Sequence, residues 1–234
     1  GQRQVKYQKF QIKASYWIKE FALYEVYKKL NFEIDQKTAF NVIHPSTIDF
    51  IHKHSEQIDY YIYSQFLCYE QRQALLNKLK SYGINLIINL PFGVEFDSAD
   101  VCFHPEVFDT KYQVGCSPEP EHGYPEQAWG VSVYKEKSEG LKRYLTEKMN
   151  WLSQLGNGVF LDHLVGWCGQ YIVPIKISPE SQYPHGHFIT ENFEERKDKI
   201  RWFLDILLKT DLQIKGEIAG DHQRVLATRA VVDD

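Results

Sequence analysis

Apolar residues recur every three or four positions along four stretches of this chain, which is the period of an amphipathic helix. The first stretch, residues 5–30, contains neither glycine nor proline, and the pattern predicts one helix there. A second helix is predicted over residues 58–82. The last two are predicted over residues 140–155 and 192–210, where an Asn and a Glu three residues later can form a capping box.

Short runs of apolar and β-branched residues follow three of these helices, and they predict buried strands. The runs occupy residues 84–90, 158–162 and 213–218. Strands that alternate with helices favour an α/β fold, a parallel sheet with helical crossovers. Residues 91–138 interrupt the alternation with five prolines. We predict a long irregular loop excursion there, and such loops commonly border a functional site.

Composition narrows the class of protein. The chain has 234 residues, of which 43% are hydrophobic and 25% charged, as in a globular protein with its own core. The formal net charge of -4 argues against a nucleic-acid partner. No apolar run approaches the roughly 18 residues of a membrane span. The four cysteines form no CxxC pair, so we expect reduced thiols in a cytoplasmic protein and no metal site. Together with the charge and the hydropathy, this predicts no nucleic-acid partner and no membrane.

Polar residues stand where each predicted strand ends: Asn89, then Asp162 with His163, then Glu217. The carboxyl ends of parallel strands meet at one edge of a sheet, so Asp162 and Glu217 would face one pocket. Two carboxyl groups about 5 to 5.5 Å apart serve a retaining glycosidase as nucleophile and acid/base. A carboxylate at a strand end is also a common cap or solvated turn residue, and the pattern alone leaves this alternative open.

A longer pattern is more specific. Residues 90–108 read LPFGVEFDSADVCFHPEVF. This resembles the motif LP-x-x-V-x-x-DSADVW-x-NP-x-xF of the amylomaltase family, the 4-α-glucanotransferases of the α-amylase clan. The resemblance continues in chain order through residues 127–134, 161–166 and 216–217. The sequence is therefore similar to this family over most of its length.

The resemblance implies a (β/α)8 barrel of TIM type. Three convincing strands are predicted here and eight close a barrel, so we expect an incomplete one. We divide the chain into a helical segment over residues 1–57 and a barrel part over residues 58–234, with the loop excursion 91–138 inside the latter. An open parallel sheet leaves edges that need cover, which a second copy of the chain or a partner chain would supply.

The resemblance also implies roles for individual residues. Asp162 matches the catalytic nucleophile, Glu217 the general acid/base and His163 a neighbour that contacts sugar. Tyr124 and Trp129 suit stacking on sugar faces, and core packing is the alternative for Trp129. The remaining substrate-binding candidates are Asn89 and Asp97. For Asp97 the alternative is an Asx turn or a helix cap.

The implied function is the transfer of α-1,4-glucan segments between maltooligosaccharides, or from starch or glycogen, by retaining double displacement. This mechanism needs no cofactor. Three departures support an alternative: Phe160 replaces a family Arg, Asn89 replaces a family Asp, and the family's third conserved Asp has no match. The alternative is a non-catalytic, glucan-binding or regulatory relative, or a fragment of a larger glucanotransferase.

Overall fold

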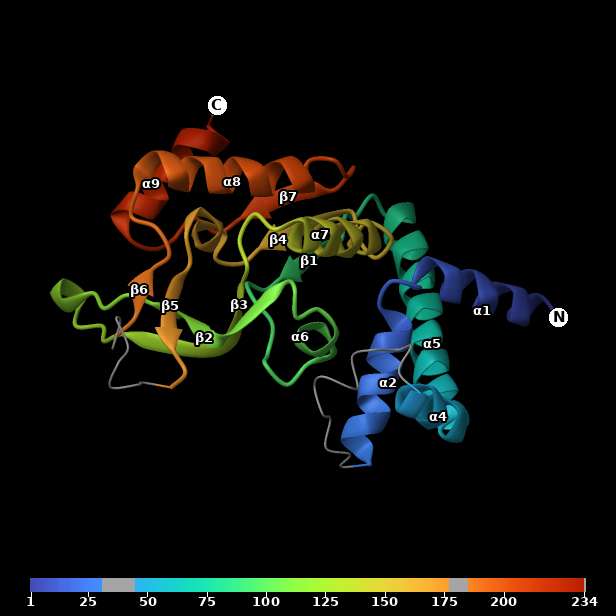
Figure 1. Cartoon of the computed structure of the whole chain (residues 1–234). Coiled ribbons are helices and arrows are strands. Elements are labelled where there is room, and N and C mark those ends of the chain that lie inside the picture. Colours follow the sequence, from blue (N-terminus) through green and yellow to red (C-terminus); the bar gives the residue numbers. More distant parts are fainter. Residues whose placement is uncertain (31–44, 177–184, 234) are drawn as a thin grey trace. The chain divides into compact units, whose positions relative to one another are not determined.

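The structure, a computed structural model (Figure 1), describes residues 1–30, 45–176 and 185–233. These residues form two units. The first comprises Gly1–Ile84 and Asp97–Phe103, and the second comprises Asn85–Phe96 and His104–Asp234. The boundary that the sequence suggested at residue 57 falls inside a helix of the first unit, and it stays a prediction.

The first unit is helical. Its helices are α1 (Gln2–Lys13), α2 (Ile18–Lys29), α4 (Pro45–Lys53), α5 (Ser55–Ser81) and α6 (Ala99–Phe103). Helix α5 confirms the helix predicted over residues 58–82, and α1, α2 and α4 all pack against it. The core between them is aromatic, since the rings of Phe10 and Phe66 lie 5.7 Å apart and both side chains are buried.

The single helix predicted over residues 5–30 is wrong. Helices α1 and α2 are separated by a turn at residues 14–17. Ala14 ends the first helix with φ of -96° and ψ of 10°. Ala14 and Ile18 are both buried, so the turn allows both helices to bury their apolar side chains within the unit. Neither glycine nor proline marks this turn, and periodicity alone therefore could not locate it.

The second unit contains a parallel sheet in the order β1-β4-β7. Its strands, β1 (Ile87–Leu90), β4 (Gly158–Leu161) and β7 (Gln213–Gly216), lie within the three predicted runs and confirm them with shorter bounds. Helices α7 (Glu139–Leu152) and α8 (Phe193–Leu207) precede β4 and β7 in the chain and confirm two helix predictions. The α/β class is therefore confirmed, but in the described residues these three strands do not close a barrel.

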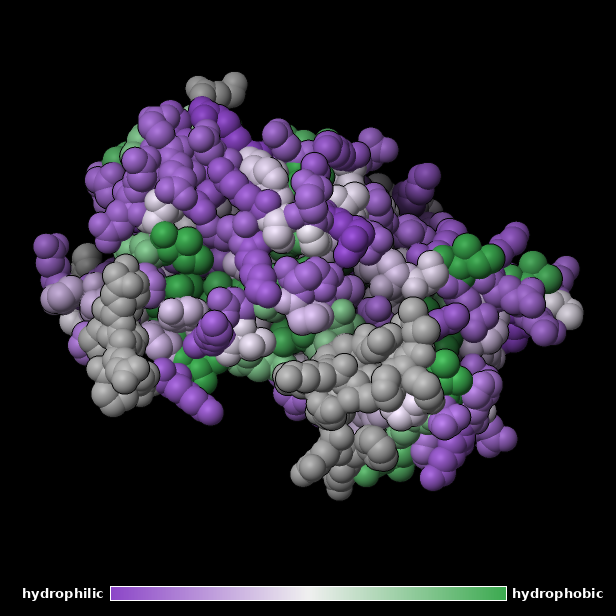
Figure 2. All heavy atoms as spheres, viewed as in Figure 1, coloured by the Kyte–Doolittle hydropathy of each residue, from purple (hydrophilic) through white to green (hydrophobic). Residues whose placement is uncertain are grey.

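The two faces of this sheet differ. Val159 and Leu161 are 0% and 1% exposed, whereas Phe160 between them is 37% exposed. Side chains alternate across a strand, so one face is packed and the other is open. The α8 side chains that face inward, Ile200, Phe203, Ile206 and Leu207, are buried. The outer surface formed by α8 is hydrophilic (Figure 2).

Both crossover helices begin at a side-chain cap. The Ser138 hydroxyl accepts a hydrogen bond from the Leu141 amide at 3.0 Å. Asn192 Oδ1 accepts from the Glu195 amide at 3.0 Å, as the predicted capping box requires. Glu195 closes the box indirectly, because its carboxylate accepts from the Thr190 hydroxyl, which in turn accepts from the Asn192 amide.

The irregular excursion predicted over residues 91–138 is wrong in its second half. Strands β2 (Phe108–Cys116) and β3 (Gln127–Tyr134) form an antiparallel hairpin there. With β5 (Tyr171–Pro174) and β6 (His187–Phe188) they build a second sheet, in the order β3-β2-β5-β6. The register shifts within the hairpin, which disturbs the alternation of apolar and polar residues. The prolines of this stretch lie in the connections outside the strands. Their number made the whole stretch resemble a loop, and the strands between them were therefore not predicted.

Candidate active site

Asp162 and Glu217 occupy the first positions after β4 and β7. Leu161 and Gly216 are partners across these strands, so the next residue of each strand lies beside its counterpart. The Asp162 amide donates to the Leu90 carbonyl at 3.0 Å, and the Glu217 amide donates to the Leu161 carbonyl at 2.9 Å. The structure therefore brings the two predicted catalytic carboxylates to neighbouring strand ends, with Asp162 half-buried and Glu217 exposed.

The chain turns sharply after Asp162. His163 adopts the left-handed conformation, with φ of 50° and ψ of 51°, and the 3-10 helix η2 (Leu164–Cys168) follows. Two hydrogen bonds tie the turn to Glu217: the His163 amide donates to Oε2 at 3.2 Å, and the Leu164 amide donates to the carbonyl at 3.0 Å. A left-handed residue other than glycine is strained, so these bonds hold the turn and orient the Glu217 carboxylate.

The His163 ring lies between aromatic side chains. The Phe92 ring is 5.5 Å away and the Trp129 ring 4.9 Å away, both edge to face. Trp129 is half-buried, and its Nε1 donates to Gln127 Oε1 at 3.1 Å. The structure thus brings Trp129 to His163, beside Asp162 and Glu217. Its stacking on a sugar stays a prediction, because packing against His163 also accounts for its position.

Two other predicted substrate-binding residues are exposed. Tyr124 is 59% exposed in the loop between β2 and β3, where its backbone pairs with that of Glu119. Asn89 lies on β1, where it is the partner of Phe160 on β4. Asn89 and Phe160 therefore stand side by side on the open face of the sheet, one residue before the strands end. The predicted roles of Tyr124 and Asn89 in binding stay predictions.

Asp97 belongs to the first unit. Its carboxylate accepts hydrogen bonds from the Tyr24 hydroxyl and from Lys28 Nζ, the latter at 2.7 Å. The hydrogen bonds from Lys28 and Tyr24 lower the pKa of Asp97 below its usual range. These contacts connect the start of the 97–103 segment to α2, which is an architectural role. A role of Asp97 in substrate binding stays a prediction.

A buried ion cluster lies behind His163. Arg224 on α9 (His222–Val232) is 0% exposed, and its Nη1 is 3.5 Å from His163 Nε2. Arg224 Nε donates to Asp221, which caps α9 by accepting from the Arg224 amide at 3.1 Å. Burial lowers the pKa of His163, the charge of Arg224 lowers it further, and Asp221 offsets part of this, giving about 4. His163 is therefore neutral at physiological pH.

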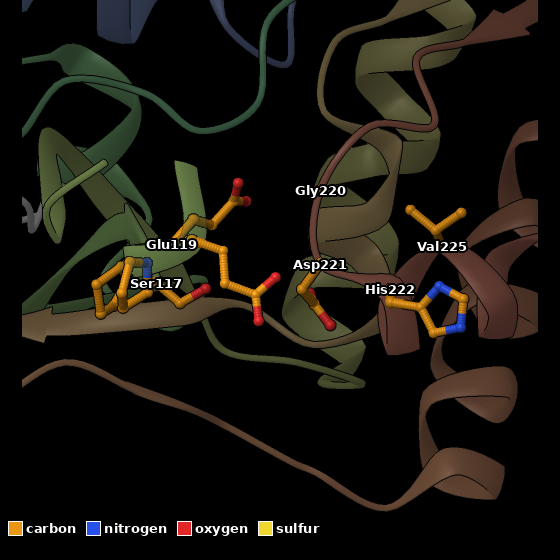
Figure 3. A pocket seen from close by; sticks show the side chains of 9 residues that line it. Ser117, Glu119, Gly220, Asp221, His222 and Val225 are labelled. Atoms are coloured by element: carbon orange, nitrogen blue, oxygen red, sulfur yellow. The ribbon is translucent and has the colours of Figure 1, made fainter. Parts of the chain in front are cut away.

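A cavity of about 480 Å³ opens beside this cluster. Ser117 and Glu119 line one side, and Gly220 and Asp221 line the other (Figure 3). Its walls carry the carboxylates of Glu119, Glu121 and Asp221 beside small and apolar side chains. The complete lining is Ser117, Pro118, Glu119, Pro120, Glu121, Gly220, Asp221, His222 and Val225.

Neither a metal-ion cluster nor a membrane-spanning helix is present in the described ranges, 1–30, 45–176 and 185–233. No group of three or more His, Cys, Asp or Glu side chains in them is arranged to hold a metal ion. Each helix in these ranges is too short or too polar for a membrane span.

Comparison with known proteins decides the family. The family model described as 4-alpha-glucanotransferase matches residues 1–220. The chain belongs to the 4-alpha-glucanotransferase family. The family resemblance that the sequence motifs indicated is therefore confirmed, and the match includes Asp162 and Glu217.

Curated relatives agree with this assignment. The chain is 25% identical over 162 residues to the 4-alpha-glucanotransferase of Chlamydia muridarum, and this match covers 64% of the present chain. It is 26% identical over 180 residues to that of Aquifex aeolicus, across 68% of its own length. The matches span only 29% and 35% of those two relatives.

Solved structures share the fold. The amylomaltase of Streptococcus agalactiae in complex with acarbose superposes with a TM-score of 0.76 at 19% identity, over 99% of this chain and 48% of that one. The amylomaltase of Corynebacterium glutamicum gives a TM-score of 0.64 at 18% identity, over 97% of this chain and 28% of that one.

Sequence reasoning missed the charged residues behind the site of this family member. Arg224 and Asp221 follow Glu217 closely, and Arg196 on α8 lies 3.9 Å from Asp221. A partial signal existed, since Asp221 precedes Arg224 by three residues, the spacing of a helix cap and its first-turn partner. That signal predicts the start of a helix, but only the packing of α9 shows that Arg224 points toward His163.

Proposed function

We propose that this chain carries the paired carboxylates of a retaining 4-α-glucanotransferase, with Asp162 as nucleophile and Glu217 as general acid/base. One observation carries the proposal: both residues follow directly after paired positions of two adjacent parallel strands. Glu217 is also tied through Oε2 to the turn that follows Asp162, at 3.2 Å from the His163 amide. Such fixed placement is what a nucleophile and a proton shuttle require.

The proposed reaction has two steps. Asp162 attacks the anomeric carbon of an α-1,4-glucan while Glu217 protonates the departing glycosidic oxygen, and a glycosyl-enzyme ester forms. Glu217 then removes the proton from the 4-hydroxyl of an acceptor glucan, which attacks the ester and regenerates Asp162. In this proposal the parallel sheet is part of a TIM-type barrel, and the carboxyl ends of β4 and β7 present the two carboxylates to the substrate.

A second candidate is a non-catalytic glucan-binding relative. Phe160 and Asn89 favour it, because they are partners on adjacent strands at positions where the family resemblance implies a charged pair. Phe160 cannot donate a hydrogen bond, so Asp162 lacks the orienting guanidinium expected two residues before it. Glucan binding would then persist through His163, Trp129 and the neighbouring cavity without turnover.

Incubation with maltotriose, followed by chromatography of the products, tests the proposal. We expect glucose and longer maltooligosaccharides from the unaltered chain, and at least about a thousandfold less product from Asp162→Asn or Glu217→Gln, since each removes a group essential to a step. The matched control is Asp205→Asn, an exposed carboxylate on α8 that should leave the rate unchanged. Product formation that survives both active-site substitutions would overturn the proposal.

Calorimetry with acarbose separates the two candidates. Acarbose is bound in the amylomaltase structure from Streptococcus agalactiae. Saturable acarbose binding without products from maltotriose would favour the non-catalytic relative. Absence of both binding and products would overturn both candidate functions for this chain by itself.

A further inference from the structure

The guanidinium of Arg224 is unusual in being fully buried near the candidate site. Among the described residues its one carboxylate partner is Asp221, which it shares with Arg196, whose Nη1 lies 3.9 Å from Asp221 Oδ1. Both guanidiniums also lie over the Phe188 ring, at 4.9 Å for Arg224 and 5.1 Å for Arg196. One carboxylate therefore balances two buried cations. Burying two guanidiniums beside one carboxylate costs desolvation energy, so a gain in stability does not explain why Arg224 is buried here.

A further contact of the Arg224 guanidinium reaches the site. Its Nη1 lies 3.5 Å from Nε2 of His163, the residue directly after Asp162. A guanidinium has only donors, so Nε2 must accept, and an accepting Nε2 carries no proton. The neutral ring then keeps its proton on Nδ1. Phe92 and Trp129 hold the ring edge to face, which limits its rotation away from Arg224.

We propose that Arg224 is a positioning residue that fixes His163 as the neutral Nδ1–H tautomer, so that the ring can offer a glucan hydroxyl only a hydrogen-bond donor. The glucan part of this inference rests on the proposed function. The tautomer part does not, because it follows from the contact between Arg224 and His163.

The charges around the ring support a neutral imidazole. Arg224 faces it from α9, and Asp221, which caps α9, acts on it with the opposite charge. Glu217 accepts from its backbone amide at the end of β7, and Asp162 precedes it in the chain. Burial lowers the pKa of His163, Arg224 lowers it further, and Asp221 opposes them. A protonated ring would place its Nε2–H against the Arg224 guanidinium, which is an unfavourable contact between two donors and two cations.

Nitrogen NMR of the histidine rings in the unaltered protein tests the tautomer directly. The His163 signal is assigned as the one that disappears in His163→Gln. We expect the pattern of an Nδ1–H ring with an unprotonated Nε2, unchanged from pH 7 to pH 5.5. An Nε2–H pattern, or a ring that becomes protonated near pH 6.5, would overturn the proposal, and this measurement needs no variant of Arg224.

Arg224→Met and Arg224→Lys then test the positioning role. We expect Arg224→Met to raise the His163 pKa by about one pH unit and to mix the two tautomers. Its maltotriose or acarbose affinity should fall about fivefold, the equivalent of one hydrogen bond. Arg224→Lys keeps the charge and should restore most of the pKa depression. The control Arg229→Met removes an exposed guanidinium from the same helix and should change none of these readouts.

The outcomes separate this inference from the proposed function. An Nδ1–H ring in a protein that binds no glucan would uphold the tautomer and overturn the proposed function. Glucan binding that is unchanged in a folded Arg224→Met, with the pKa and tautomer also unchanged, would overturn the role of Arg224 and leave the proposed function intact.

Discussion

His163 contacts most of the residues that form the candidate site. Its backbone adopts a left-handed turn after Asp162, its amide holds the Glu217 carboxylate, and its ring contacts Trp129 and Arg224. The sequence predicted His163 as a sugar contact by family resemblance. It could not predict the Arg224 contact, because the two residues are 61 positions apart and belong to different elements.

The depressed pKa of His163 predicts a pH dependence of stability. The folded protein holds this ring neutral down to about pH 4, whereas the unfolded chain protonates it near its ordinary value of 6.5. The unfolded state therefore binds more protons between these values, and the free energy of unfolding should fall by about 3 kcal/mol as pH decreases from 6.5 to 4. Urea titrations across this range measure the slope.

Two variants identify the residue responsible for that slope. His163→Gln should make it shallower, because the imidazole is gone and only carboxylates with a lowered pKa, such as Asp97, remain to titrate. His52→Gln, at an exposed position of α4, should leave the slope as it is in the unaltered chain. Equal slopes in all three proteins would contradict the assignment to His163.

Local signals predicted the elements that end or begin at a cap. Asn192 and Glu195 placed the start of α8 correctly, since a capping box needs only neighbours in sequence. The β2–β3 hairpin escaped prediction, because its shifted register depends on pairing between distant residues. An element is therefore predictable here to the extent that its defining contacts are local.

Helix α7 offers a test of this local control. Ser138→Ala removes the acceptor of the Leu141 amide and should lower the free energy of unfolding by about 1 kcal/mol. Chemical denaturation of both proteins measures the difference. Ser153→Ala, at the other end of α7, is the control, since that hydroxyl bonds the Asn150 carbonyl and caps no helix N-terminus. A loss in Ser153→Ala as large as in Ser138→Ala would contradict the cap argument.

At the scale of the molecule, the parallel sheet has unpaired edges within the described residues. The amides of Gln213 and Glu217 point toward β4, so alternation places those of Ile214 and Gly216 at the free edge of β7. Phe160 on the open face is exposed as well. Exposed strand edges favour pairing with another chain.

We therefore expect the chain to self-associate. Sedimentation velocity should show a concentration-dependent dimer, and hydrogen exchange of the Ile214 and Gly216 amides should slow as the dimer forms. Ile214→Pro removes an outward-facing donor without breaking the pairing with β4, so it should yield a folded monomer. A chain that stays monomeric, with rapid exchange at both amides at every concentration, would contradict this expectation.

The sequence by itself determined the α/β class, the three parallel strands, the family and the two strand-end carboxylates. Periodicity, caps and contiguous motifs encode these features in neighbouring residues. Only the tertiary structure decided the turn at Ala14, the antiparallel sheet and the contact of Arg224 with His163. These depend on which buried surfaces fit together across long separations in the chain, and a pattern of neighbouring residues does not specify that fit.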